Sequence, residues 1–184
     1  MQKYLDLDWL WANKTMVHYF GLGFIQLKID NKHRVHFYTN ELMKTVGDEE
    51  IHNHRYNFVS EVLKGEFSQD IYDVTPVEMV EATHLLSQES CNENIIPTNI
   101  IAPVPVKIEK FYSETISEGE KYFMDHHSFH TVYSADAITF LTRSDYKKEL
   151  ADVASPKDKT LVCPFSIKLS EDEIFDIIKG LLKK

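Results

Sequence analysis

Segments rich in β-branched and aromatic residues recur at short intervals along most of this 184-residue chain. Turn-forming residues separate them, as at 64–66, 75–76 and 134–136. This series predicts an all-β sandwich or barrel. In addition to a hairpin over 24–39, the expected strands cover 56–64, 67–74, 77–85, 104–112, 121–124, 129–133, 137–143 and 160–167.

The alternation within 24–39 predicts the register of the first hairpin. With a loop at 31–33, the expected pairs on the apolar face are Ile29 with Val35, Leu27 with Phe37, and Ile25 with Thr39. The other face is polar and carries His36 and Tyr38. A half-buried antiparallel pair has this pattern. Solvent exposure of these two side chains is favoured over a position at the mouth of a barrel.

Helices are expected near both ends of the chain. A short helix around 5–14 would pack Trp9 and Trp11 on the body of the domain. A C-terminal helix over 170–183 starts with a Ser170–Glu173 capping box and carries one apolar stripe. Packing of this stripe on the barrel is favoured over binding to a partner. Residues 86–103 are expected to form a long surface loop, and 144–158 a short helix or loop.

Charge and length narrow the classes of function. A net charge of −9 argues against non-specific binding to nucleic acid or to an anionic membrane. The length fits one domain, 1–184, and no apolar run approaches the roughly 20 residues that cross a bilayer. The N-terminus does not resemble a signal peptide. Cys91 and Cys163 are expected to be free thiols in a reducing cytosol, so a cytoplasmic location is predicted.

The histidines form a more specific pattern than any other residue type. His52 and His54 are two residues apart, so on an extended strand both point to one face and can reach a common point. A solvent-exposed strand end is the alternative for an isolated H-x-H. His126 and His127 are interpreted as turn residues, with His126 a reserve ligand by strand parity.

Two stretches around these histidines resemble the conserved motifs of the cupin superfamily. Residues 47–66, GDEEIHNHRYNFVSEVLKGE, resemble the first motif, which has a Gly, an H-x-H and a strand closed by a Gly turn. Residues 119–132, GEKYFMDHHSFHTV, resemble the second and place His130 as the third ligand. The resemblance implies a cupin-type double-stranded β-helix, or jelly-roll barrel. The barrel core would cover about 20–167.

Departures from the cupin pattern bear on the metal. Phe58 stands where most cupins carry a metal-binding Glu, and Ser134 where an Asn is frequent. The resemblance therefore implies three neutral imidazole ligands, His52, His54 and His130, with coordination positions left open. Such a set suits a divalent metal such as Fe, Zn, Ni or Mn. It is similar to the site of thiol dioxygenases, and closer still to uncharacterised cupin-like proteins with an H-x-H-x-x-x-F pattern, some of them phage-encoded.

Further residues are candidates for binding a small-molecule substrate. Arg55 would act from the rim because strand parity turns it away from the histidines, and Tyr56 could donate a hydrogen bond. Arg143 could instead form an ion pair with one of the many carboxylates. The full candidate set is Arg55, Tyr56, His36, Tyr38 and Phe58.

Three functions remain open on the sequence. The first is a metal-dependent enzyme, possible chemistries including that of a dioxygenase. The second is a non-catalytic protein that binds or sequesters a small molecule or nucleotide-like signal. The third is a metal-free sugar-nucleotide isomerase or epimerase with a histidine base and a tyrosine acid. The cupin resemblance also implies a homodimer.

Overall fold

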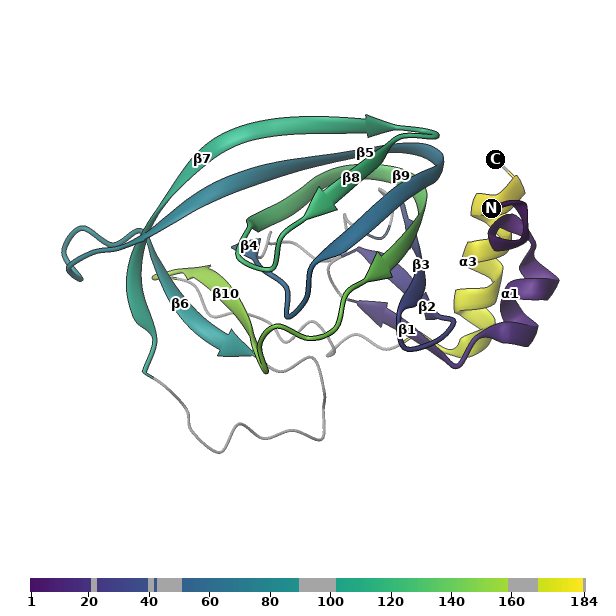
Figure 1. The fold of residues 1–184 in the computed structure, drawn as a ribbon, viewed down its shortest axis with the longest axis horizontal. Helices are drawn as coiled ribbons and strands as arrows, with labels where there is room; N and C mark the ends of the chain where they lie inside the picture. The colour runs from purple at the N-terminus through teal and green to yellow at the C-terminus, as the bar shows by residue number, and fades with distance from the viewer. Residues whose placement is uncertain (21–22, 40–41, 43–50, 90–101, 159–168, 184) are drawn as a thin grey trace.

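A computed structural model of the chain describes residues 1–20, 23–39, 42, 51–89, 102–158 and 169–183 (Figure 1). Most of the described residues lie in strands, and every pairing between these strands is antiparallel, so the expected all-β class is confirmed. The strands are β1 Met16–Phe20, β2 Phe24–Lys28, β3 His33–Tyr38, β4 Ile51–His52, β5 Phe58–Pro76, β6 His84–Glu89, β7 Val104–Ser117, β8 Lys121–Met124, β9 Phe129–Arg143 and β10 Ala151–Pro156. The helices are a 3-10 turn Gln2–Leu5, α1 Leu7–Asn13 and α3 Glu171–Lys183.

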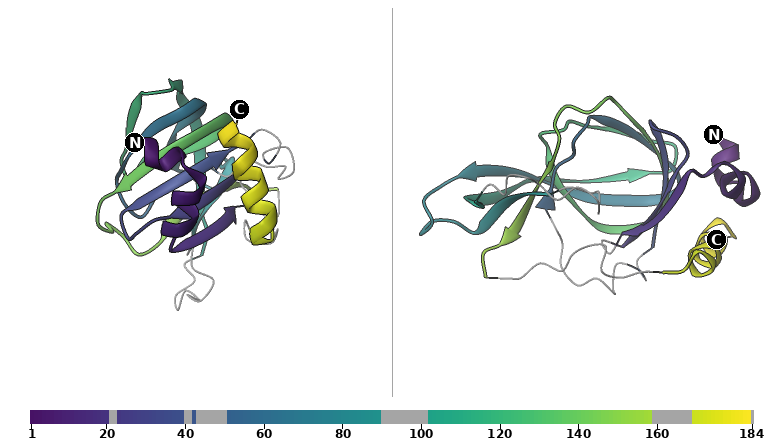
Figure 2. Two further views of the ribbon diagram at one scale, coloured as in Figure 1. Left: turned by 90° about the vertical axis from the view of Figure 1, so that its right-hand side faces the viewer. Right: turned by 90° about the horizontal axis from the view of Figure 1, so that it is seen from below.

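The described strands form one sheet that closes on itself. Its order is β1-β2-β3-β9-β4-β10-β6-β7-β5-β8, and an additional pairing joins β9 to β5. The two long strands β5 and β9 therefore lie side by side, and their pairing closes the sheet. Figure 2 (right) shows the strands curving round into a barrel with both helices on its outside.

Two expected turns are wrong, because β5 and β9 each continue through them. At Gly65 the backbone adopts φ +78°, and a Cβ there would lie 2.0 Å from the carbonyl oxygen of Asp136. The register of β5 against β9 shifts between Val62 and Lys64 at this point. Glycine thus permits a close-packed irregularity inside a continuous strand. In the sequence, a glycine at such an irregularity looks the same as a glycine in a turn.

The register of the first hairpin differs by two residues from the expected one. Ile25 pairs with Phe37 and Leu27 with Val35. Asp30 explains the shift: its Oδ1 accepts hydrogen bonds from the backbone N–H groups of Lys32 and His33, at 2.7 and 2.9 Å, and places the turn one residue earlier. A shift of two keeps the division into an apolar and a polar face.

The terminal helices cover the apolar face of this hairpin. α1 and α3 lie next to each other against β1–β3, as Figures 1 and 2 show. As expected, Ser170 and Glu173 form a reciprocal capping box, and the apolar stripe of α3 packs on the sheet. The residues of this core include Leu10, Ile25, Leu27, Val35, Phe37, Ile138, Ile174, Ile178 and Leu181.

The polar face of the hairpin consequently points into the barrel. The expectation that His36 and Tyr38 are exposed is wrong: they are only 8% and 6% exposed. Tyr38 packs with Phe67 of β5 and Ala137 of β9, and Arg34 is buried on the same face. Because the helices cover the apolar face, the polar side chains of the other face lie in the interior, beside apolar side chains such as Phe67.

Several smaller expectations also change. The strand expected over 77–85 begins only at His84, and the segment 144–158 contains β10, which pairs with both β4 and β6. The expected strand 160–167, Cys91 and Cys163 lie outside the described residues. Among the described helices, none combines the length and apolar composition needed to cross a bilayer.

Candidate metal centre

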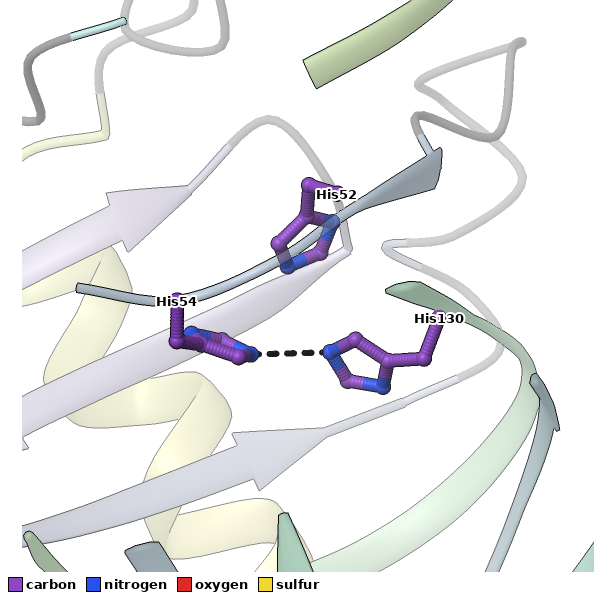
Figure 3. Close-up of side chains that lie close together, drawn as sticks. All are labelled: His52, His54 and His130. Carbon is purple, nitrogen blue, oxygen red and sulfur yellow. Dashed lines mark hydrogen bonds between the residues drawn. The ribbon is translucent and has the colours of Figure 1, made fainter. Parts of the chain in front are cut away.

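Three histidines converge inside the barrel from two paired strands (Figure 3). His52 of β4 lies directly opposite His130 of β9 in the antiparallel register. His54 follows β4 and, being two residues from His52, returns to the same face. One ring nitrogen of each histidine lies within 4.8 Å of the other two. The structure therefore brings together the three residues that the motifs predicted as ligands.

The spacing of the three rings fits one shared metal ion. The ring centroids are 4.8, 5.0 and 5.1 Å apart, close to an equilateral triangle. An imidazole bound at about 2.1 Å has its ring centre about 3.2 Å from the ion, so three ligands at 90–109° would have centroids roughly 4.5–5.2 Å apart. The observed triangle lies inside this range, and the donor set is one that Fe, Zn and Ni accept.

The contact between His54 and His130 is also compatible with a shared ion. Their Nε2 atoms are 2.9 Å apart. Two lone pairs cannot face each other at that distance without repulsion, so either a proton or a cation must lie between them. Two ligand nitrogens at 90° around one ion would be about 3.0 Å apart. The observed separation is close to this value, and it is also that of an N–H···N hydrogen bond.

A chain of two hydrogen bonds, from His130 to Gln69 and from Gln69 to Glu114, fixes which nitrogen of His130 faces His54. The carboxylate of Glu114 accepts a hydrogen bond of 2.7 Å from Nε2 of Gln69, which turns the amide oxygen of Gln69 towards His130. That oxygen accepts the Nδ1–H of His130 at 2.8 Å. The lone pair of His130 is therefore on Nε2 and directed at His54, which is the orientation that a metal-ligating histidine needs.

Burial keeps the imidazoles of His54 and His130 neutral. It lowers the pKa of His54 well below its usual value, and the neighbouring His130, His52, His36 and Arg34 lower it further. Burial, with a contribution from His52, also lowers the pKa of His130 well below the usual value. A neutral imidazole is the form that binds a metal, so both side chains are ready to bind at neutral pH.

A second polar network holds the H-x-H segment in place. The buried side chain of Asn53 donates to Asp152 Oδ2 at 2.8 Å and accepts from Lys148 Nζ at 2.7 Å. Asn53 N–H also donates to the carbonyl of Asp152. The central residue of His52-Asn53-His54 is thus tied to β10, while its two neighbours point inwards.

Phe58 borders the site in place of a carboxylate. Its ring is 4.9 Å from that of His54 and packs with Ile71, Met124 and Leu141. Glu61 cannot substitute, because it forms an ion pair with Lys121 at 3.1 Å on the other side of β5. The described residues thus supply three imidazoles and an apolar wall.

The other predicted binding residues fall into two groups. Tyr56, 5.9 Å from His54 between ring centroids, and the buried His36 and Tyr38 lie on the inner face. Arg55 is turned away, as strand parity predicted, and its guanidinium stacks 4.5 Å from the ring of Tyr146. His126 does not join the three histidines: its Nδ1 contacts Asn57 Oδ1 at 2.8 Å.

His126, His127 and Asp125 form a second, more exposed group that could hold a metal. Asp125 also accepts the backbone N–H of His127 at 2.9 Å, which is a turn contact. The expectation that these histidines are turn residues is consistent with this geometry.

Sequence reasoning missed the residues that support the ligands. Gln69 is fully buried on β5 between the inward-facing Phe67 and Ile71, and a polar residue in such an apolar alternation is the signal that could have found it. Glu114 and Asp152 carry no comparable signal, because their partners lie far away in sequence.

No protein-family model matches this chain, and no curated protein matches it. Relatives therefore do not test the cupin resemblance of the two histidine motifs. The closed antiparallel barrel and its buried histidine group are what the structure shows, and the function has to be inferred from the geometry of that group.

Proposed function

We propose that His52, His54 and His130 hold one divalent metal ion, and that the protein is a metal-dependent, cupin-like enzyme acting on a small molecule. The single observation that carries this proposal is the near-equilateral triangle of three histidine rings, one buried and two partly buried, with 4.8–5.1 Å between centroids. Gln69 and Glu114 support it, since they direct the lone pair of His130 into the triangle.

Three neutral protein ligands leave positions open for a substrate atom, water or dioxygen. When bound, the metal would supply Lewis acidity or a binding position for oxygen. The protein supplies an apolar environment beside the histidines, formed by Phe58, Leu141 and Met124. Tyr56 lies next to His54, with 5.9 Å between the two ring centroids.

Metal content tests the proposal. Protein purified without a His-tag should bind one divalent ion per chain in a titration monitored by elemental analysis. His54→Ala should lower the affinity by a large factor because it removes one of three ligands. His84→Ala is the matched control, since His84 lies on β6 and its ring contacts Thr83 rather than the histidine triangle.

Absence of stoichiometric metal, or equal affinity of His54→Ala and wild type, would contradict the proposal. Activity that survives chelation would favour the metal-free isomerase, and a ligand recovered unchanged from a metal-loaded protein would favour a binding function.

A further inference from the structure

All three arginines of the chain gather at one end of the barrel on two tyrosines. Arg34 lies 4.8 Å and Arg143 5.3 Å from the ring centroid of Tyr56. Arg143 lies 4.2 Å and Arg55 4.5 Å from the ring of Tyr146. We call these five residues the arginine–tyrosine ladder. The two tyrosine rings are themselves 5.9 Å apart, so the ladder is continuous.

The ladder leads from the surface to the histidine triangle. Tyr146 at its outer end is half exposed, whereas Arg34 and Arg143 are each only 8% exposed. Arg34 donates from Nη1 to the hydroxyl of Tyr56. The ring of Tyr56 is 5.9 Å from that of His54.

Local charge balance is unusual for an acidic protein. The chain has 29 acidic residues, yet within the described residues neither Arg55 nor Arg143 lies within 4.0 Å of a carboxylate. The only side-chain hydrogen bond of Arg143 among the described residues runs from Nη1 to the carbonyl oxygen of Ser144, and its buried Nε has no partner there. The alternative of a simple ion pair for Arg143 is therefore not supported.

Strand register brings two of these charges together. Arg34 pairs with Leu141, so Arg143 is the next residue of β9 on the same face. Diagonal neighbours on a sheet are about 7–8 Å apart, and like charges at such positions repel. The buried guanidinium of Arg143, with no carboxylate within 4.0 Å among the described residues, is costly unless an anion compensates it.

We propose that the ladder is an oxyanion site that binds the carboxylate or phosphate group of the substrate. Guanidinium groups recognise both oxyanions by paired hydrogen bonds, and Nε of Arg143 is available for one of them. The position beside His54 places the rest of a small ligand at the histidine triangle. This last step rests on the proposed metal function, whereas binding of the anion itself does not.

Anion binding to the metal-free protein tests the proposal separately from metal binding. Full-length protein treated with chelator and desalted is titrated calorimetrically with inorganic phosphate and, separately, with acetate, at constant ionic strength set by chloride. Wild type should bind at least one of the two. Arg143→Gln should weaken that binding by about tenfold or more, the usual effect of losing a charged hydrogen bond. Lys107→Gln, the same change of charge at an exposed residue of β7, should leave it unchanged.

Arg55→Gln is a second variant for the case that Arg143→Gln fails to fold, because Arg55 is less buried and should weaken binding by a smaller factor. Binding of phosphate alone or acetate alone would support the site and identify its anion. No binding of either anion by wild type would overturn the proposal, as would equal affinities of wild type and the folded arginine variants. Metal content of the same variants should stay at the wild-type value, which separates failure of the ladder from failure of the metal site.

Discussion

Replacing Gln69 by leucine should weaken metal binding without changing any ligand. Gln69 is fully buried, and its oxygen accepts the Nδ1–H of His130. Leucine has a similar volume but no acceptor, so it leaves that N–H buried without a partner. It also removes the donor that Glu114 uses. Losing a hydrogen-bond partner that orients a metal-ligating histidine typically costs about 10- to 100-fold in metal affinity.

The same substitution should destabilise the metal-free protein by about 1–3 kcal/mol, the cost of an unsatisfied buried polar group. Zinc affinity is measured by competition with a chromophoric chelator, and the free energy of unfolding by urea titration in the presence of EDTA. Ser68→Ala is the control: it removes a hydrogen bond to Thr115 from the neighbouring residue on the opposite face of β5. If Gln69→Leu keeps wild-type zinc affinity, this chain of hydrogen bonds does not direct His130, and the reasoning fails.

Two further predictions concern the barrel itself. Burial lowers the pKa of His36 to about 3, with Arg34 adding to the effect, so unfolding at mildly acidic pH takes up a proton. Stability of the metal-free protein should fall by up to about 1.4 kcal/mol per pH unit from this residue as the pH drops below about 6.5 towards 3. Urea titrations at pH 7, 5.5 and 4.5 should show a shallower fall for His36→Asn; parallel curves would contradict it. Gly65→Ala should cost at least about 2 kcal/mol, because φ is +78° and the Cβ would meet Asp136. Gly119→Ala, with φ +85° but open space, should cost clearly less, and equal midpoints in thermal melts would refute the explanation.

The sequence was sufficient where the pattern is local. The H-x-H spacing placed His52 and His54 on one face, and the capping box at Ser170 marked the start of α3. Both depend on residues that are neighbours along one element. His130 required the motif resemblance, since nothing local links it to a partner 76 residues away.

The features that could not be predicted depend on contacts between residues far apart in the sequence. His36 and Tyr38 are buried because α1 and α3 cover the opposite, apolar face of their hairpin. A glycine within a polar triplet suits a turn as well as a strand irregularity, so the continuity of β5 through Gly65 depends on its contact with β9. The convergence of Arg34 and Arg143 likewise follows from the pairing of β3 with β9.

Anomalous diffraction from crystals of untagged, zinc-loaded protein would test the central claim most directly. One strong peak at the zinc edge should lie within the triangle formed by the rings of His52, His54 and His130. A peak only at the exposed group of Asp125, His126 and His127, or no peak in a protein whose solution contains stoichiometric zinc, would contradict the assignment of the buried histidines as the metal centre.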